Sequence, residues 1–290
     1  MRIPRACDTA AITIVAICVT GCGGNTGLER LSRARSLSAD LLVQFTRAAD
    51  ASNKAVMATS DEASIAFARD AETAKHAVQT DVEAIDPVLR ALDYADELRL
   101  VQEFSPRFAA YREMDRLILD LAVENTNLKA QRLSFGPAQE TADAFAASLE
   151  TVAPLNAADG WRVKALAAAA VAEVRQIQAL QAPHIANAED TEMSRMEERM
   201  AASEKKARAG LETLGPLVQP GSRTALTAAA GALDRFMALN GEITALSRRN
   251  TNVHSLALTL NEKGKLTRAC EDTLAGLRAA LDTRGFTATR

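Results

Sequence analysis

The sequence predicts an all-α protein built as two tandem up-down four-helix bundles of about 125 residues each, after an N-terminal signal peptide. Three observations favour this fold. Ala, Leu, Glu and Arg are abundant while aromatic residues make up only 4% of the chain, a composition typical of helices. Apolar residues recur at steps of three and four over long stretches. The tripeptide Asn-Thr-Asn occurs at 125–127 and again at 250–252.

The first 21 residues are typical of a signal peptide. Arg2 and Arg5 precede a short apolar segment over 10–19, which is too short to span a bilayer. The tetrapeptide at 19–22, Val-Thr-Gly-Cys, resembles the bacterial lipobox. This resemblance implies cleavage before Cys22, acylation of that residue with palmitate-type chains, and a stable membrane anchor. The alternative is an ordinary secretory signal with a chance cysteine.

The remaining composition narrows the location and the function. Residues 22–27 are expected to form a flexible tether, and Gly23, standing where Asp favours inner-membrane retention, favours the outer membrane. Loss of the signal peptide changes the formal charge from −3 to −4, which gives no electrostatic case for binding nucleic acid. Cys270 is the only other cysteine of the mature chain, so no intramolecular disulfide is expected.

The two Asn-Thr-Asn tripeptides lie in similar helical patterns. Ile118 and Leu121 before the first correspond to Ile243 and Leu246 before the second, at an offset of 125. A rare polar tripeptide in register with flanking aliphatic residues indicates a tandem repeat. We therefore expect unit 1 over 28–157, unit 2 over 158–284, and a disordered tail over 285–290.

Each unit is expected to contain four helices. In unit 1, a first helix ends near Ala58, the run Thr59–Glu62 caps a second, and a third runs continuously through the tripeptide. Gly136-Pro137 should end that third helix and start the fourth. In unit 2, Ser222 is expected to cap the long helix that ends near Leu260.

The tripeptide helices resemble the third helix of the sensory four-helix bundle of methyl-accepting chemotaxis receptors. The segments concerned are 121–130 and 246–258, and the segments 69–72 and 78–82 of the preceding helix are similar too. The resemblance implies a periplasmic bundle that binds small solutes. The chain lacks the transmembrane and signalling parts of these receptors, so only the sensing part is expected here.

Asn125 and Asn250 fall on the apolar packing faces of their helices. One interpretation is that each is a buried residue that fixes helix register. The other is that Asn125 and Asn250, with Thr126 and Thr251, line a polar ligand pocket. In a continuous helix the next two positions are rotated by about 100° and 200°, so Asn127 is expected to be solvated.

Arg132 lies on the same face and has two interpretations, a side chain that reaches solvent or a buried cation that binds an organic acid. Arg248 and Arg249 are expected to form a solvated surface pair. Cys270 is expected to be a buried, inert thiol, and the stripe Met193, Met196 and Met200 to be core.

No catalytic or cofactor motif is present, so we expect no enzyme, no metal and no cofactor. The 3 histidines lack metal-ligand spacing, and no nucleophile motif or glycine-rich phosphate loop occurs. Two functions remain. The first is a lipid-anchored periplasmic sensory protein that binds a small organic solute and relays occupancy to a membrane partner. The second is a structural or interaction scaffold of the cell envelope, which binds an envelope protein and no ligand.

Overall fold

The computed structural model describes residues 24–284, and its regular structure there is helical apart from an isolated bridge between Pro154 and Val218. The all-α prediction is confirmed for this part of the chain. The predicted signal peptide, Cys22 and the tail 285–290 lie outside the described residues. The first α-helix begins at Gly24, so residues 24–27, predicted to be part of a flexible tether, are helical.

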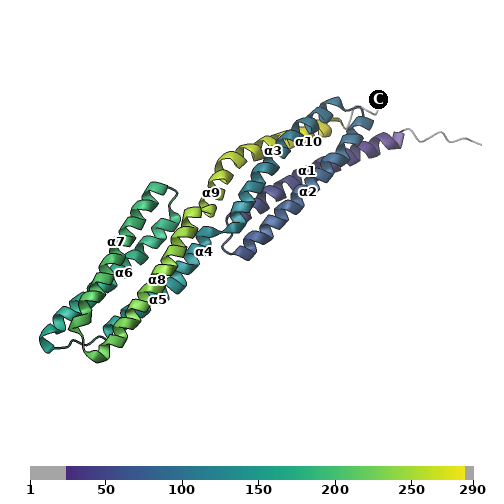
Figure 1. Cartoon of the computed structure of the whole chain (residues 1–290). Coiled ribbons are helices and arrows are strands. Elements are labelled where there is room, and N and C mark those ends of the chain that lie inside the picture. Colours follow the sequence, from purple (N-terminus) through teal and green to yellow (C-terminus); the bar gives the residue numbers. More distant parts are fainter. Residues whose placement is uncertain (1–23, 285–290) are drawn as a thin grey trace, which may run out of the picture.

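The helices form two elongated lobes that meet end to end at the middle of the molecule (Figure 1). Lobe 1 contains α1 (Gly24–Val56), α2 (Asp61–Ala91), α3 (Ala95–Glu124) and α10 (Gly264–Thr283). Lobe 2 contains α5 (Gln139–Glu150), α6 (Gly160–Ala186), α7 (Asp190–Leu214) and α8 (Arg223–Arg249). Two short helices, α4 (Thr126–Leu133) and α9 (Thr251–Leu258), lie where the two connections between the lobes cross.

The fourth helix of each lobe comes from the other half of the sequence. Helix α5 follows α3 in the chain but packs against α8 and α6, and α10 follows α8 but packs against α3 and α1. The expected units 28–157 and 158–284 therefore do not each close a bundle of their own. They exchange their last helices, and each lobe is completed by the partner half.

The exchange follows from where the helices break. The predicted stop at Gly136-Pro137 is wrong, because a π-helix over Ser134–Ala138 joins α4 directly to α5. A second π-helix, Thr259–Lys263, joins α9 to α10 at the equivalent place, and it has Glu262 where the first has Pro137. Proline is therefore not the cause of this geometry. The helices break instead at Asn125 and Asn250, so the chain leaves one lobe and continues into the other.

Each lobe has its own apolar core. In lobe 1, Phe45 is surrounded by the rings of Phe104, Phe108 and Tyr111, with its ring centroid 5.0 Å from that of Tyr111. Each such buried side chain contributes about 1.5–3 kcal/mol. In lobe 2, the predicted methionine stripe is confirmed as core, with Met193, Met196 and Met200 each at most 9% exposed.

Cys270 is fully buried in the lobe 1 core, as predicted. Removal from water disfavours the thiolate and raises the pKa of this thiol to about 12. It is therefore an unreactive packing residue.

Two predicted helix caps have different outcomes. Ser60 caps α2, and its side chain accepts a hydrogen bond from the amide of Ala63. Ser222 immediately precedes α8 but makes no capping bond, because its hydroxyl accepts instead from the amide of Ala153 at 3.0 Å. That bond fixes the turn between α7 and α8 against the segment that follows α5.

The two ends of the described chain lie together at the far end of lobe 1 (Figure 1). The guanidinium of Arg35 on α1 donates to the carbonyl of Leu281 on α10 at 3.1 Å. Within residues 24–284, no helix is both long enough and apolar enough to cross a membrane.

Candidate functional site

The two connections between the lobes cross at the Asn-Thr-Asn tripeptides. Asn125 and Asn250 have φ of 52° and 51°, and with Asp93 they are the non-glycine residues of positive φ in the described chain. Asn tolerates this left-handed conformation better than most residues because its short polar side chain hydrogen-bonds locally. Each asparagine ends one helix and precedes the next, which turns the chain into the other lobe.

The hydrogen bonds at this crossover are related by an approximate twofold symmetry. The amide of Thr126 donates to the hydroxyl of Thr251 at 3.1 Å, and the amide of Thr251 donates to the hydroxyl of Thr126 at 3.1 Å. The amides of Asn127 and Asn252 likewise donate to each other's side-chain oxygens, both at 3.2 Å. The tripeptides therefore satisfy the buried or partly buried backbone amides at the start of α4 and α9, which have no partner inside their own helices.

The symmetry is incomplete at the asparagine side chains. Asn250 accepts from Asn127 Nδ2 and donates to the carbonyl of Asn187, both at 2.7 Å. Asn125 accepts from Asn252 Nδ2 at 2.8 Å, but within the described chain its own buried Nδ2 has no hydrogen-bond partner. The lobe 2 side of the crossover is therefore the more strongly bonded side.

The structure brings together four of the predicted site residues, Asn125, Thr126, Asn250 and Thr251, all buried at the crossover. Their polar groups bond chiefly to one another and to the facing tripeptide, which fits the interpretation of buried residues that fix register. The prediction that Asn127 is solvated is wrong: this residue is 6% exposed. The helix breaks at the preceding residue, so the angular offsets of a continuous helix do not apply.

Arg132 lies away from this group. Its Nη1 pairs with Asp61 Oδ2 at 3.0 Å, and its side chain is 47% exposed. Of the two interpretations, the structure shows the side chain that reaches solvent, and Asp61 at the start of α2 is its partner.

A buried charge cluster occupies the core of lobe 1, and all four helical segments of the lobe contribute to it. Asp115 on α3 is fully buried and accepts from Lys75 on α2 at 2.7 Å. Its other oxygen accepts from Lys263 at 3.1 Å and from the hydroxyl of Ser52 on α1. The two lysine side chains are only 3% and 2% exposed. We call Ser52, Lys75, Asp115 and Lys263 the lobe 1 charge cluster.

The lobe 1 charge cluster contains more buried positive than negative charge. Lys263 donates to Asn53 at 3.1 Å as well as to Ser52 and Asp115, which uses its three N–H groups. Burial lowers the pKa of this ammonium, and the carboxylate of Asp115 opposes that effect. Lys75 has a second carboxylate partner, Glu72, at 2.7 Å, but the Glu72 side chain is 60% exposed.

Lobe 2 has a neutral network at the equivalent place. Asn240 replaces Asp115 at the offset of 125, and it accepts from Gln181 Nε2 at 2.9 Å. Gln181 plays the part of Ser52, since each reaches from the first helix of its half to this position. Ala138 stands where lobe 1 has Lys263. Charge at this position of the core is therefore a property of lobe 1.

Two adjoining grooves between α2 and α3 lead from the surface to this cluster. Their volumes are about 250 and 720 Å³, and Glu72, Lys75 and Arg112 line both. His76 borders the larger groove, while Glu113 and Arg116 border the smaller. Lys75 thus lines both surface grooves although its side chain is only 3% exposed.

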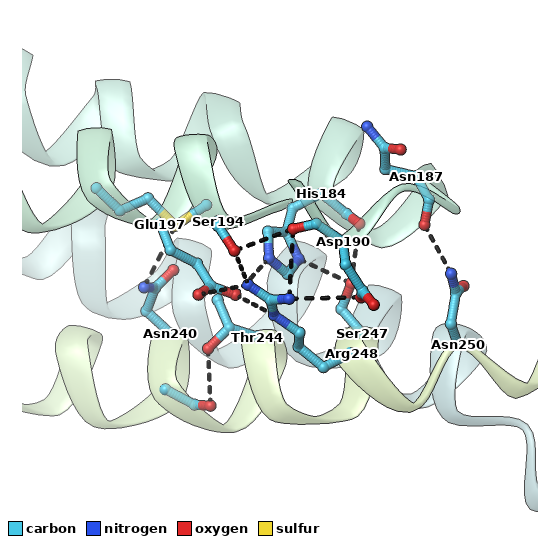
Figure 2. A network of polar contacts seen from close by, with 12 residues as sticks. His184, Asn187, Asp190, Ser194, Glu197, Asn240, Thr244, Ser247, Arg248 and Asn250 are labelled. Atoms are coloured by element: carbon cyan, nitrogen blue, oxygen red, sulfur yellow. Dashed lines mark hydrogen bonds and ion pairs between the residues drawn. The ribbon is translucent and has the colours of Figure 1, made fainter. Parts of the chain in front are cut away.

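A second polar network lies in lobe 2 beside the crossover (Figure 2). The fully buried ring of His184 on α6 contacts Ser247 Oγ through Nδ1 and Glu197 Oε1 through Nε2, both at 2.8 Å. The Ser247 hydroxyl also lies 2.9 Å from the carbonyl oxygen of His184, and it can donate its single proton either to that carbonyl or to Nδ1. Because an ionised carboxylate only accepts, the contact with Glu197 is a hydrogen bond in which Nε2 donates.

Arg248 on α8 completes this network. Its guanidinium binds both oxygens of Glu197, at 2.8 and 3.0 Å, and donates to Ser194 at 2.8 Å. These charge-assisted bonds lower the pKa of Glu197, with the bond from Arg248 the largest contribution and the bond from His184 adding to it. The prediction of a solvated arginine pair is therefore wrong for Arg248, whereas Arg249 is 63% exposed and pairs with Glu124.

Sequence patterns missed both networks, although one signal was present. Asp115 interrupts the apolar face formed by Tyr111 and Ile118, and a carboxylate there requires a buried partner. The lysines gave no such signal, because Lys75 and Lys263 stand in polar surroundings in the sequence. The contact of Lys263 with Asp115 depends on the exchange of helices, whereas that of Lys75 depends on how α2 packs against α3.

Neither metal sites nor relatives indicate an activity. Residues 24–284 contain no group of three or more His, Cys, Asp or Glu side chains placed to hold a metal ion. Comparison with protein families, with curated proteins and with solved structures found no match.

Proposed function

We propose that this chain is a lipid-anchored binding protein of the cell envelope that captures a small solute in lobe 1 without chemical conversion. The observation that carries the proposal is the lobe 1 charge cluster below the grooves between α2 and α3. Lobe 2 has the same helical plan with a neutral core network. The bundle fold therefore does not require these charges.

Energetics support a role beyond stability. Removing charges from water costs several kcal/mol per ion, and a buried ion pair often stabilises a fold no better than apolar residues of the same size. Burying two ammonium groups with only one buried carboxylate therefore lowers the free energy of unfolding. Lys75 lines a surface groove, so ligand binding by its ammonium group would explain why this unfavourable buried charge is present.

The position of the anchor supports a sensory role. Helix α1 begins at Gly24, two residues after the predicted lipidated Cys22, so lobe 1 is the lobe next to the membrane and lobe 2 projects away from it. Helix α8 alone has 27 residues, which corresponds to about 40 Å. Helix displacements in lobe 1 would pass through the crossover into lobe 2, where a membrane receptor or another envelope protein could detect them.

A second function, an interaction scaffold without ligand, is favoured by one observation. Trp161, at the start of α6, is 74% exposed, and Leu155 in the preceding connection is 49% exposed. Large exposed aromatic residues are typical of protein contact surfaces. In this scaffold the lobe 1 charge cluster would only hold the four helices in register.

Thermal unfolding separates the two functions. A binding protein is expected to show a raised Tm with at least one compound of a library of water-soluble metabolites, because a ligand that binds only the folded state stabilises it. The variant Lys75→Met should lose that response, and Trp161→Ala should keep it. If no compound raises the Tm, and capture of an envelope protein depends on Trp161, the scaffold is the correct function.

The membrane anchor has its own test. Cells that express the chain with radiolabelled palmitate are expected to give a labelled protein in the membrane fraction, and Cys22→Ser should be unlabelled. A Cys22→Ser protein that still fractionates with membranes to the same extent would contradict lipid anchoring at this residue.

A further inference from the structure

We infer that the ligand of lobe 1 is a small oxyanion, a carboxylate or a phosphate, held between Lys75 and Arg112. This inference rests on the proposed function and specifies its ligand class. It follows from the donors that the structure presents on the two grooves between α2 and α3.

Lys75 supplies a donor at the floor of both grooves. An ammonium group has three N–H donors, and two of them bind Glu72 and Asp115, each at 2.7 Å. The third has no acceptor among residues 24–284, so a ligand in the groove can supply one. Because the side chain is 3% exposed, an anion bound there is partly removed from water, where its attraction to the ammonium is strengthened.

Arg112 supplies the second group. Its side chain is exposed and lines both grooves. Its guanidinium lies 5.9 Å from the ring centroid of Phe108, and no carboxylate of residues 24–284 lies within ion-pair distance of it. By contrast, the neighbouring Arg116 is paired with both Glu113 and Asp120. A planar guanidinium with free donors suits the two oxygens of a carboxylate or phosphate.

Glu72 is the competing anion in this site. Its carboxylate is the partly solvated partner of Lys75, so a ligand oxyanion can displace it into water at little cost. The remaining charges that face the grooves are His76, Glu113 and Arg116. Of these, only Glu113 is acidic, and it is neutralised by Arg116. Once Glu72 is displaced into water, Lys75 and Arg112 are the unneutralised donors of the grooves, and they attract an anion.

The test is isothermal titration of the lipid-free chain from residue 23 at constant ionic strength. The probes are acetate, succinate, citrate, inorganic phosphate, glycerol and putrescine, and the Tm is followed in parallel. Binding of one or more oxyanions, without binding of glycerol or putrescine, is expected, and the preferred probe distinguishes carboxylate from phosphate. Binding of only the neutral or cationic probes would overturn the oxyanion inference and leave the proposed solute binding intact.

Two surface variants locate the site without disturbing the core. Arg112→Gln should weaken oxyanion binding about tenfold or more, while Glu72→Gln should strengthen it several-fold by removing the competing charge. Arg199→Gln, an exposed position on α7 of lobe 2, is the matched control and should leave the Kd unchanged. An oxyanion Kd that none of the lobe 1 variants changes places binding elsewhere and overturns the inference. If no probe and no library compound binds, the proposed function fails with it.

Discussion

At the scale of single residues, Asn125 and Asn250 combine two properties that few residues share. Each adopts the left-handed conformation in which helix α3 or α8 ends, and each side chain bonds across to the facing tripeptide. Glycine would adopt the backbone conformation more easily but would leave the facing side chains without partners. The choice of asparagine therefore links the bend of the chain to the pairing of the two connections.

The two asparagines are expected to differ in their contribution to stability. Asn250→Gly loses two side-chain hydrogen bonds, to Asn127 and to the carbonyl of Asn187. Asn125→Gly loses one and removes an amide that has no partner in the described chain. Since each buried hydrogen bond is worth about 1 kcal/mol, we expect losses of about 2 kcal/mol for Asn250→Gly and 1 kcal/mol or less for Asn125→Gly.

Urea unfolding of the two variants checks this difference. Each variant is the control for the other, because the same Asn→Gly change alters the backbone equally at both positions. Equal losses would show that the incomplete symmetry of the side chains has no energetic effect. Asn125→Ala should be less stable than Asn125→Gly, because alanine does not readily take a φ of 52°.

The Glu197 network predicts a pH dependence. The bonds from Arg248 and His184 lower the pKa of Glu197 in the folded state. A carboxylate with a depressed folded pKa adds stability above its unfolded pKa, of about 4.3, and this stability is lost as the pH falls through the folded pKa. The free energy of unfolding should therefore fall between about pH 5 and pH 3, and Glu197→Gln should fall less steeply over this range.

The measurement for this prediction is urea unfolding at several pH values for the wild type and Glu197→Gln. Glu113→Gln is a suitable control, because Glu113 has a lowered pKa from Arg116 but is fully exposed, where solvent screening reduces the effect. If the two variants change the fall in unfolding free energy between about pH 5 and pH 3 equally, the partial burial of Glu197 beside His184 does not strengthen its ion pair.

At the scale of helices, the sequence predicted elements and faces better than partners. Periodicity identified the apolar faces of the long helices, and the offset of 125 between the tripeptides is the offset between their hydrogen-bonded threonines. The same periodicity predicted a continuous helix through Asn125, and the Gly136-Pro137 pair predicted a stop there; both predictions were wrong. A left-handed asparagine and a proline within a π-helix depend on neighbours that a local pattern does not contain.

The exchange of helices could not be predicted for a related reason. A helix with an apolar face fits either lobe, because the two halves carry nearly the same pattern of apolar residues. The distinguishing residues are Asp115 and Lys263, which meet only when the halves exchange α5 and α10. In bundles made from one half each, Lys263 would face Asn240 instead.

The exchange is measurable by spin-label distances. Arg99 on α3 and Arg278 on α10 are exposed positions of lobe 1. Their helices are in contact, since Leu100 Cδ2 is 3.9 Å from a Cβ built at Gly276. Labels at 99 and 278 should therefore lie within about 25 Å, because neighbouring helices pack about 10 Å apart.

The matched pair for this measurement carries labels at Arg99 and Glu150. These residues are joined by α3, α4 and α5 running from lobe 1 into lobe 2 (Figure 1), which at 1.5 Å per residue places them about 75 Å apart. If each half closed its own bundle, the second distance would be the short one. Cys270 needs no replacement, since a buried thiol with a pKa of about 12 does not react with the label.

At the scale of the whole molecule, the sequence indicated part of the candidate site. It singled out Asn125, Thr126, Asn250 and Thr251, which the structure brings together at the crossover. It did not single out Lys75 or Arg112, because a charged residue on a helix is usually solvated and only the packing of α2 against α3 shows otherwise. The crossover was thus visible in the sequence, whereas the charge cluster depends on the tertiary fold.

The two lobes are expected to lose stability together, because the α3–α5 and α8–α10 connections each belong to both. Asp115→Asn leaves two buried ammonium groups without their shared carboxylate, a change that typically costs about 3–5 kcal/mol. If the lobes unfold as one unit, hydrogen exchange should speed up by a similar factor in α2 of lobe 1 and in α6 and α7 of lobe 2.

The neutral counterpart in lobe 2 provides the control for this experiment. Asn240→Ala removes an uncharged partner of Gln181 and should cost only about 1–3 kcal/mol, the desolvation of one unpaired amide. Its smaller increase in hydrogen-exchange rate should also appear in both lobes. Faster exchange confined to α1, α2 and α3 in Asp115→Asn would show that lobe 1 opens alone, and the crossover bonds would then be too weak to carry a displacement from lobe 1 to lobe 2.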